Sequence, residues 1–138
     1  DITGEILPGW KIIASYAYTD AEVTKDNATP VGNQLDNVPF NQASLWTTYV
    51  IQKGNLKGLG FGFGLFYIGE RQGDLANSFS LPSYLRTDAA LYHRRDRFNA
   101  AINVRNLFDI DYGSYSFGRA FIQRGSPFTI IGSISWTF

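Results

Sequence analysis

The chain has 138 residues, with 12 basic and 12 acidic side chains, no Cys, no Met, and 3 Trp, 8 Tyr and 11 Phe. This length allows one domain with a modest core, and the absence of Cys excludes disulfide frameworks and thiolate metal sites. A net charge of zero offers no basic footprint for nucleic acid, and no segment approaches the roughly 18 apolar residues of a membrane-spanning helix. Because the chain begins with Asp1 and contains no Met, we expect it to be processed or cut from a longer protein.

The N-terminal third predicts one strand between a turn and a loop. Residues 1–3 look like the tail of a preceding strand, and residues 4–9 (GEILPG) predict a turn, which Pro and Gly favour. From Trp10 to Tyr18, apolar and aromatic residues alternate with polar ones, which is the pattern of a strand with one apolar face. Residues 20–42 are polar and have no period, and they predict a long loop.

Residues 43–51 predict a second strand whose faces the sequence leaves unassigned. Leu45 and Tyr49 fall on one parity, while Trp46 and Val50 fall on the other. Both faces therefore carry large apolar side chains, and the period of two does not decide between them.

The third strand, residues 59–71, follows a short charged turn at residues 52–58 and is the most informative segment. One parity consists of large apolar residues, namely Leu59, Phe61, Phe63, Leu65 and Tyr67. The other parity consists of Gly58, Gly60, Gly62 and Gly64. Because glycine leaves nothing to pack, this face must meet a close neighbour or an internal space. The spacing also contains GxGxG, but a nucleotide fingerprint needs a turn that leads into a helix, and this run is the strand itself.

A polar loop at residues 72–82 leads to a fourth strand, residues 83–93, which carries Arg86 and Asp88 opposite its apolar side chains. Burying these charges in a small soluble core would be costly unless they paired. The wet interior of a barrel accommodates them at little cost, so the pattern favours a barrel wall.

The C-terminal third repeats the alternation. A charged turn at residues 94–97 leads to a fifth strand, residues 98–111, with Arg105 on its polar side. Residues 112–127 predict a third long loop, and residues 128–138 predict a last strand that ends in Phe.

Short and long connections alternate, being short after residues 3, 51 and 93 and long after residues 19, 71 and 111. This asymmetry, with strands of about 9 to 11 residues, is typical of outer-membrane barrels with short periplasmic turns and long extracellular loops. We therefore predict an all-β fold, an antiparallel up-and-down meander of about six strands. Membrane barrels have about 8 strands or more, and an open sheet in lipid would leave unpaired edges, so these strands should be part of a larger barrel.

Several segments resemble TonB-dependent outer-membrane receptors. Residues 103–109 (NVRNLFD), followed by Tyr112, are similar to a signature near the C-terminus of that family, although Ile110 and Asp111 stand where the family often has a Lys. Similarity to the ferric-siderophore branch, including ferrichrome-type receptors, is carried by Gly9-Trp10, residues 16–21 (YAYTDA), residues 37–39 (NVP), Leu45-Trp46, Tyr49, residues 69–74 (GERQGD) and residues 81–84 (LPSY).

The resemblance implies a barrel of about 22 strands closed around an N-terminal plug. Residues 1–138 would be the C-terminal portion of this barrel, without the signal peptide, the TonB-contacting segment and the plug domain. The implied function is TonB-dependent uptake of a ferric siderophore across the bacterial cell outer membrane, by binding and transport and not by catalysis. The expected partners are the ferric siderophore, outer-membrane lipid, the protein's own plug domain and remaining barrel strands, TonB through the missing N-terminal region, and the barrel-assembly machinery. We expect no cofactor and no nucleic acid.

The candidate functional residues fall into three groups, and none is catalytic or metal-binding, because the single His93 has little to build a triad or a metal site with. The candidate ligand-binding residues on the last long loop, whose arginines and aromatics suit an anionic or aromatic iron chelate, are Tyr115, Phe117, Arg119, Phe121 and Arg124. The residues expected to face the lumen or plug are Gly58, Gly60, Gly62, Gly64, Arg86, Asp88 and Arg105, with plain space-filling and hydration as the alternative. The residues that look like an assembly signal are Ile134, Trp136 and Phe138, with an ordinary edge strand as the alternative.

Two other functions stay open at this point. One is a plugged receptor for a different ligand, such as cobalamin, haem or a saccharide. The other is a soluble β-sheet binding domain, which would need both faces of residues 59–71 to be covered by protein.

Overall fold

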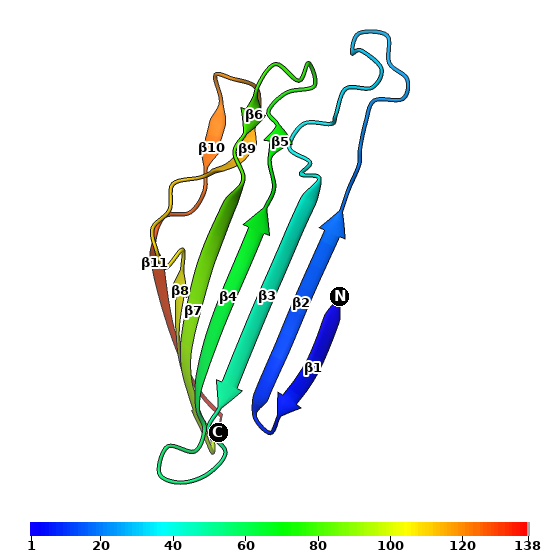
Figure 1. Cartoon of the computed structure of the whole chain (residues 1–138). Coiled ribbons are helices and arrows are strands. Elements are labelled where there is room, and N and C mark those ends of the chain that lie inside the picture. The colour runs from blue at the N-terminus through cyan, green and yellow to red at the C-terminus, as the bar shows by residue number, and fades with distance from the viewer. Residues whose placement is uncertain (138) are drawn as a thin grey trace.

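The computed structural model of the chain describes residues 1–137, and its regular elements are strands. They are β1 (Ile2–Leu7), β2 (Trp10–Tyr18), β3 (Asn41–Val50), β4 (Leu59–Ile68), β5 (Arg71–Gln72), β6 (Ser80–Leu81), β7 (Tyr84–Arg95), β8 (Phe98–Arg105), β9 (Gly113–Ser116), β10 (Ile122–Arg124) and β11 (Thr129–Trp136). Seven of them run side by side in one long curved sheet (Figure 1). Within residues 1–137 there is no helix that could cross a membrane.

The main sheet is antiparallel, with the order β1-β2-β3-β4-β7-β8-β11 and with β1 and β11 at its edges. The predicted meander is therefore confirmed, but the sheet has seven strands and not six. The additional strand is β1, in which Gly4 pairs with Ile12 instead of belonging to a turn. The turn is confined to Pro8 and Gly9, where Gly9 provides the positive φ of 84° that the backbone needs.

Short and long connections alternate, as predicted, and they gather at opposite ends of the sheet (Figure 1). The short connections are residues 8–9, 51–58 and 96–97, and the long ones are residues 19–40, 69–83 and 106–128. The second and third long connections contain short strand pairs of their own, β5–β6 and β9–β10. We refer to the two ends as the short-turn end and the long-loop end.

The strand register gives the sheet one apolar face and one polar face. Phe61 lies beside Tyr49 and Leu91 on the apolar face, whereas Gly64 lies beside Trp46 on the polar face. This register assigns the faces of β3, which the sequence leaves open. Tyr49 belongs to the apolar face and Trp46 to the polar face, because only the pairing with β4 fixes which parity points where.

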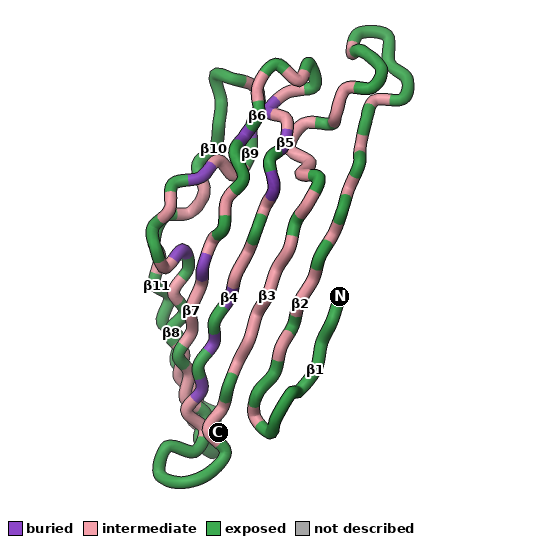
Figure 2. The backbone as a smooth tube through the Cα atoms, viewed as in Figure 1, coloured by how far each residue is buried: buried purple, intermediate pink, exposed green. Residues whose placement is uncertain are grey.

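Large side chains of the apolar face are exposed in this chain, and exposed residues recur along the strands of the main sheet (Figure 2). Many of its large side chains are 37% to 76% exposed, namely Trp10, Tyr16, Tyr18, Tyr49, Phe61, Phe63, Tyr67, Leu85, Leu91, Ile102, Ile130, Ile134 and Trp136. The buried hydrophobic side chains among residues 1–137 are Leu81 and Tyr112, both at the long-loop end. The described chain therefore lacks the core that a soluble sandwich packs between two sheets.

Aromatic residues form two rows on the apolar face. The short-turn aromatic row consists of Trp10, Tyr49, Phe98 and Trp136, and the row at the long-loop end includes Tyr16, Tyr18 and Tyr67. The Phe98 and Trp136 rings are 6.1 Å apart between centroids. Two aromatic girdles that flank an apolar band are the pattern of a barrel wall in lipid.

Two strands end earlier than the alternation predicts. β4 ends at Ile68, and Arg71 already belongs to β5, which pairs with β6. β8 ends at Arg105 and does not continue to residue 111, because Asn106 takes a positive φ of 54° that breaks the strand.

Candidate functional site

Three glycines of β4 lie beneath aromatic side chains of the neighbouring strands on the polar face. A Cβ added to Gly60 would lie 2.1 Å from the Tyr92 ring, and one added to Gly64 would lie 2.4 Å from the Trp46 indole. The same indole covers Gly62, at 2.8 Å from an added Cβ. Side chains of the neighbouring strands therefore fill the space above these glycines. This agrees with the alternative interpretation, in which the glycines only make room for packing. That their face borders a lumen or a plug stays a prediction.

Gly58 has a different role from the other glycines of the series. It lies in the turn before β4 with a φ of 88°, and an added Cβ would lie 2.0 Å from the carbonyl oxygen of Arg94. Its N–H donates to the carbonyl of Ile51 at 2.9 Å. The turn backbone requires this glycine, so its assignment to the glycine face of the strand is corrected.

We expect Gly64→Ala to lower the free energy of unfolding by about 1–3 kcal/mol, because the added methyl group displaces the Trp46 indole. Gly132→Ala on β11 is the matched control, since nothing lies within 4 Å of the Cβ that it would carry. The measurement is the temperature at which the full-length protein unfolds in detergent. Equal unfolding temperatures for the two variants would show that the packing of the Trp46 indole does not require a glycine at position 64.

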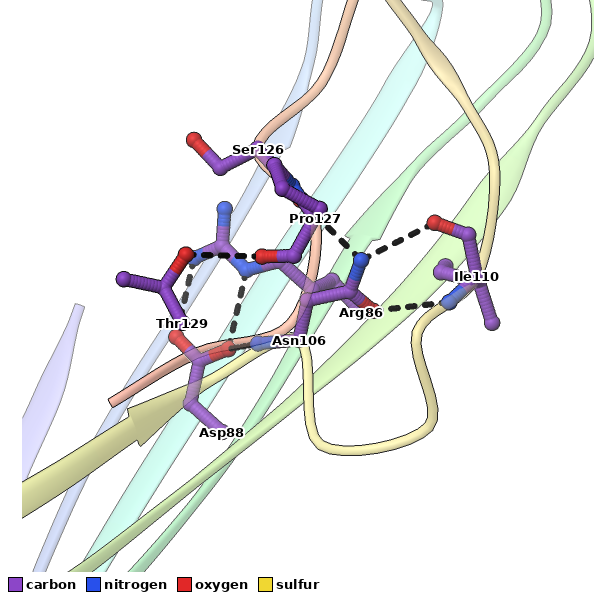
Figure 3. A network of polar contacts seen from close by, with 7 residues as sticks. All are labelled: Arg86, Asp88, Asn106, Ile110, Ser126, Pro127 and Thr129. Carbon is purple, nitrogen blue, oxygen red and sulfur yellow. Dashed lines mark hydrogen bonds and ion pairs between the residues drawn. The ribbon is translucent and has the colours of Figure 1, made fainter.

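Arg86 and Asp88 pair with each other on the polar face (Figure 3). The Nε and Nη2 groups of Arg86 donate to the two carboxylate oxygens of Asp88 at 3.0 Å each, and both side chains are 14% exposed. The guanidinium also lies 4.6 Å from the centroid of the Phe66 ring. The bidentate pair offsets the cost of removing each charge from water. Arg105, the third charged residue predicted for this face, is exposed and lies opposite Thr129 on β11.

Asn106 is fully buried and joins β7 to both ends of the third long connection (Figure 3). Its backbone N–H donates to Asp88 Oδ1 at 2.9 Å. Its side-chain Nδ2 donates to the carbonyls of Ile110 at 2.9 Å and Ser126 at 3.0 Å, while its Oδ1 accepts the N–H of Ile110 at 2.9 Å. One side chain thus fixes where the long connection leaves the sheet and where it returns.

The three long connections are joined to each other by two asparagine side chains. Asn37 donates from Nδ2 to the Ser116 carbonyl at 2.9 Å and accepts the Ser116 N–H at 2.7 Å. The backbone N–H of Asn37 donates to the carbonyl of Gln72 at 2.8 Å. Asn77 makes the same two-way contact with the backbone of Gln34, at 2.8 Å in each direction. Each side-chain amide pairs with the N–H and C=O of one residue in another loop, as a neighbouring strand would. These contacts hold the three loops together.

Arg71 is 4% exposed beneath these loops. Its Nη2 donates to the carbonyl of Gly113 on β9, and its guanidinium lies 5.7 Å from the Tyr84 ring, which is 4.2 Å from the Tyr112 ring. Burial lowers the pKa of Arg71, although an arginine remains charged at neutral pH. Its Nη1 has no hydrogen-bond partner among the described residues. Asn37, Arg71 and Asn106 lie in segments that carry the family resemblance, but the sequence does not predict their contacts or those of Asn77, because the partners are distant in the chain.

The predicted ligand-binding residues come together on or beside the hairpin β9–β10. Tyr115 is on β9 and Arg124 is on β10. Phe117 and Phe121 lie between the two strands and are 76% and 73% exposed. The Tyr115 and Phe117 rings are 4.7 Å apart, so the hairpin presents a patch of aromatic surface.

The two arginines of this group are held differently. Arg119 donates to the carbonyl of Ser78 at 2.8 Å and lies 5.4 Å from the Phe79 ring, so it links the hairpin to the second long connection. In that connection, hydrogen bonds from Ser78 hold the pKa of Asp74 below its usual value. Arg124 forms an exposed ion pair with Asp111 at 3.7 Å. Contact of these arginines with a ligand stays a prediction.

We expect Asn37→Ala to speed hydrogen exchange at the Ser116 amide by about tenfold, because that amide loses its acceptor and net hydrogen-bond contributions are about 0.5–1.5 kcal/mol. Asn27→Ala in the same loop is the control, since Asn27 is exposed. The measurement is hydrogen–deuterium exchange of peptides that contain Ser116 in the full-length protein. Unchanged exchange in Asn37→Ala would contradict the coupling of the first and third loops.

His93 lies within β7 on the apolar face, opposite Leu59 and Ala100. It is half-buried near the short-turn end, away from the hairpin β9–β10. Residues 1–137 contain no group of three His, Asp or Glu side chains that could hold a metal ion.

Comparison with known proteins identifies the family. Residues 1–107 match the family model described as TonB dependent receptor-like, beta-barrel. The chain belongs to this family. The barrels of TonB-dependent receptors lie in the outer membrane of Gram-negative bacteria and serve transport, so the predicted location and barrel fold are confirmed.

Two curated relatives are similar over almost the whole chain. The metal-pseudopaline receptor CntO of Pseudomonas aeruginosa is 36% identical over 138 residues, covering 99% of this chain and 20% of that protein. The ferrichrome outer membrane transporter/phage receptor of Escherichia coli K12 is 37% identical over 132 residues, covering 92% of this chain and 18% of that protein. The chain therefore spans about a fifth of the length of the curated relatives that it matches.

Solved receptor structures contain the same sheet. The siderophore receptor PiuA from Acinetobacter baumannii is 29% identical with a TM-score of 0.84, covering 97% of this chain and 20% of that one. The ferric-catecholate import receptor Fiu from E. coli K12 is 27% identical with a TM-score of 0.79, covering 99% of this chain and 20% of that one. These receptor structures support the siderophore branch that the sequence resembles.

Two of the three residues predicted as an assembly signal are described. Ile134 and Trp136 lie on the apolar face of β11, opposite Ala100 and Phe98. Phe138 lies outside the described residues. The role of the three residues in assembly stays a prediction.

Proposed function

We propose that residues 1–138 are the C-terminal portion of the barrel of a TonB-dependent receptor that takes up a ferric siderophore. The observation that carries this proposal is the arrangement of the three long connections at the long-loop end. Three connections from different strand pairs are hydrogen-bonded together there, and they present exposed aromatics and arginines on one hairpin. The function is binding and transport, and the metal is cargo and not a resident cofactor.

The chemistry of the hairpin suits a chelate that carries oxygen anions and apolar surface. Phe117 and Phe121 offer exposed rings, while Arg119 and Arg124 offer planar groups that bind carboxylate or hydroxamate-type oxygens with two parallel hydrogen bonds. Because Asn37 fixes the hairpin at Ser116, these groups are presented with little loss of conformational entropy on binding.

The sheet itself supports a place in a larger barrel. Its edges β1 and β11 carry backbone groups that would be costly in lipid without further strands, and the remaining strands of the barrel would pair with them. The polar face, with the Arg86–Asp88 pair, the covered glycines and Arg105, would face the plug domain of the same protein. The signal peptide, the plug and the TonB-contacting segment belong, on this proposal, to the parts of the protein outside these 138 residues.

A receptor for the chelate of another metal is the second candidate. The observation in its favour is that the relative CntO, at 36% identity, carries the name of a metal-pseudopaline receptor and not of an iron receptor. The names of the ferrichrome transporter at 37% and the ferrioxamine B receptor at 32% favour iron.

The test is growth of a receptor-deleted strain that carries the full-length gene. The strain is starved of iron and given ferrichrome, ferrioxamine B or a catecholate chelate, and in parallel it is starved of zinc or nickel and given the corresponding chelates. Growth on at least one ferric siderophore, lost when TonB is deleted, supports the first proposal. Growth under zinc or nickel starvation alone supports the second candidate. No TonB-dependent growth on any chelate would contradict both.

A further inference from the structure

The net charge of zero conceals a separation of charge along the sheet. The three long connections contain eight acidic side chains, Asp20, Glu22, Asp26, Asp36, Glu70, Asp74, Asp109 and Asp111, against four basic ones, Lys25, Arg71, Arg119 and Arg124. At the other end, the turns at residues 51–58 and 96–97, together with the last two residues of β7, contain five basic side chains against the single acidic Asp96. We call these five residues, Lys53, Lys57, Arg94, Arg95 and Arg97, the basic rim.

The fold brings the basic rim together from two hairpins. The backbone N–H of Arg94 donates to the carbonyl of Gly58 at 2.9 Å, which ties the end of β7 to the turn before β4. A concavity of about 710 Å³ lies between the two segments, and its lining includes the basic Lys57, Arg94 and Arg95 and the acidic Asp96. Charges that are more than 35 residues apart in sequence therefore surround one polar hollow at the short-turn end.

Little within the chain neutralises the basic rim. Its ion pair among the described residues is between Arg95 and Asp96, at 4.0 Å with side chains 71% and 90% exposed. Arg94 donates from Nε to the neutral Asn99 at 3.0 Å. All five side chains of the basic rim are exposed. Because exposed charges interact weakly through water, the basic rim contributes little to the stability of the fold.

The basic rim lies at the level of the short-turn aromatic row and in the turns beyond it. Arg95 is opposite Phe98 in the register, and Phe98 is in turn opposite Trp136, so the arginine continues the apolar face toward the turn. Tryptophan and its neighbours in such a row mark the boundary between hydrocarbon and headgroups. The long side chains of Lys and Arg reach from this level toward phosphate groups while their methylene stems stay on apolar surface.

We propose that the basic rim, apart from Arg94, whose side chain lies on the polar face with Asn99, binds the phosphate groups of anionic phospholipids in the membrane leaflet that faces the short turns. In barrels of this family the short turns are periplasmic, so this leaflet is the inner one of the outer membrane. Arginine pairs with phosphate through two parallel hydrogen bonds, and each basic residue near an anionic surface strengthens association by about fivefold. The site is distinct from the chelate-binding end and does not depend on which chelate is transported.

The test uses the full-length receptor reconstituted in vesicles that contain equal parts of phosphatidylglycerol and phosphatidylcholine. Spin-labelled forms of the two lipids are compared for their relative association with the protein by electron paramagnetic resonance. The triple variant Lys57→Gln, Arg95→Gln and Arg97→Gln is expected to lower the selectivity for phosphatidylglycerol by roughly threefold or more. Lys25→Gln at the long-loop end is expected to leave it unchanged.

Two further arms keep the outcome decisive. A charge-conserving variant, Lys57→Arg, Arg95→Lys and Arg97→Lys, should retain most of the selectivity, and raising the salt concentration should weaken it in the unmodified protein. If the neutral triple variant does not assemble, the salt dependence and the charge-conserving variant still test the site. The proposal is overturned if the unmodified receptor does not prefer phosphatidylglycerol. It is also overturned if the neutral variant keeps the full preference, and the basic rim would then be a candidate surface for a periplasmic partner.

Discussion

Replacing Ile102 with Arg is expected to remove most of the assembled receptor from the outer membrane. Ile102 lies on the apolar face of β8, between Leu91 and Gly132, and is 48% exposed in this chain. A lipid-facing charge near the middle of the bilayer costs about 2–4 kcal/mol, which lowers the ratio of inserted to uninserted protein by roughly thirtyfold to a thousandfold. The measurement is the amount of heat-modifiable full-length receptor in purified outer membranes.

Asn103→Arg is the matched control for that variant. Asn103 is the next residue of the same strand, is exposed, and lies on the polar face between Ala90 and Ile131. The same charge and a similar volume are thus introduced one residue away on the opposite face, and we expect near-normal assembly. Equal loss of both variants would contradict the assignment of faces, and a loss in Asn103→Arg alone would reverse it.

Asn106→Ala is expected to lower the free energy of local opening of the third long connection by about 2–5 kcal/mol. The substitution removes three side-chain hydrogen bonds to the backbone of Ile110 and Ser126 and leaves those groups without their buried partners. Alanine also tolerates the positive φ of 54° less well than asparagine does. The measurement is hydrogen exchange of residues 106–128 in the full-length receptor, where faster exchange is expected.

Asn103→Ala serves as the control for this second prediction, because Asn103 is exposed and has the same side chain. An intermediate effect is expected for Asn106→Asp, which keeps the acceptor for the Ile110 N–H and loses the donors to Ile110 and Ser126. If exchange of residues 106–128 is unchanged in Asn106→Ala, the asparagine does not hold the connection.

The strands and their faces are largely readable from the sequence, because a period of two is a local property. The alternation in β2, β4 and β7 needs no knowledge of the neighbouring strands. β3 is ambiguous on its own and is assigned only by its pairing with β4, where Leu45 lies opposite Leu65. Only the first residues of β1 are predicted, as the tail of a strand, because Gly4 and the nearby Pro8 resemble a turn, and pairing with β2 extends the strand to Leu7.

The contacts that build the candidate site are much less visible in the sequence. The spacing of the glycines shows where side chains are small, but the Trp46 ring that covers two of them comes from another strand. The alternation runs on through residues 106–111, and nothing local shows that the Asn106 amide bonds Ser126, 20 residues later. The Asn37 to Ser116 contact joins residues 79 apart, so no short pattern predicts it.

The most direct test of the central claim, a barrel wall with its long loops outside and its short turns inside, is the labelling of two single cysteines. The chain has no native Cys, and Asn27 and Asn55 are exposed asparagines at the long-loop end and the short-turn end. In a full-length receptor without other cysteines, a membrane-impermeant maleimide is added to intact cells and to cells with a permeabilised outer membrane. We expect Asn27→Cys to be labelled in intact cells and Asn55→Cys to be labelled only after permeabilisation. Labelling of Asn55→Cys in intact cells, at the level of Asn27→Cys, would contradict it.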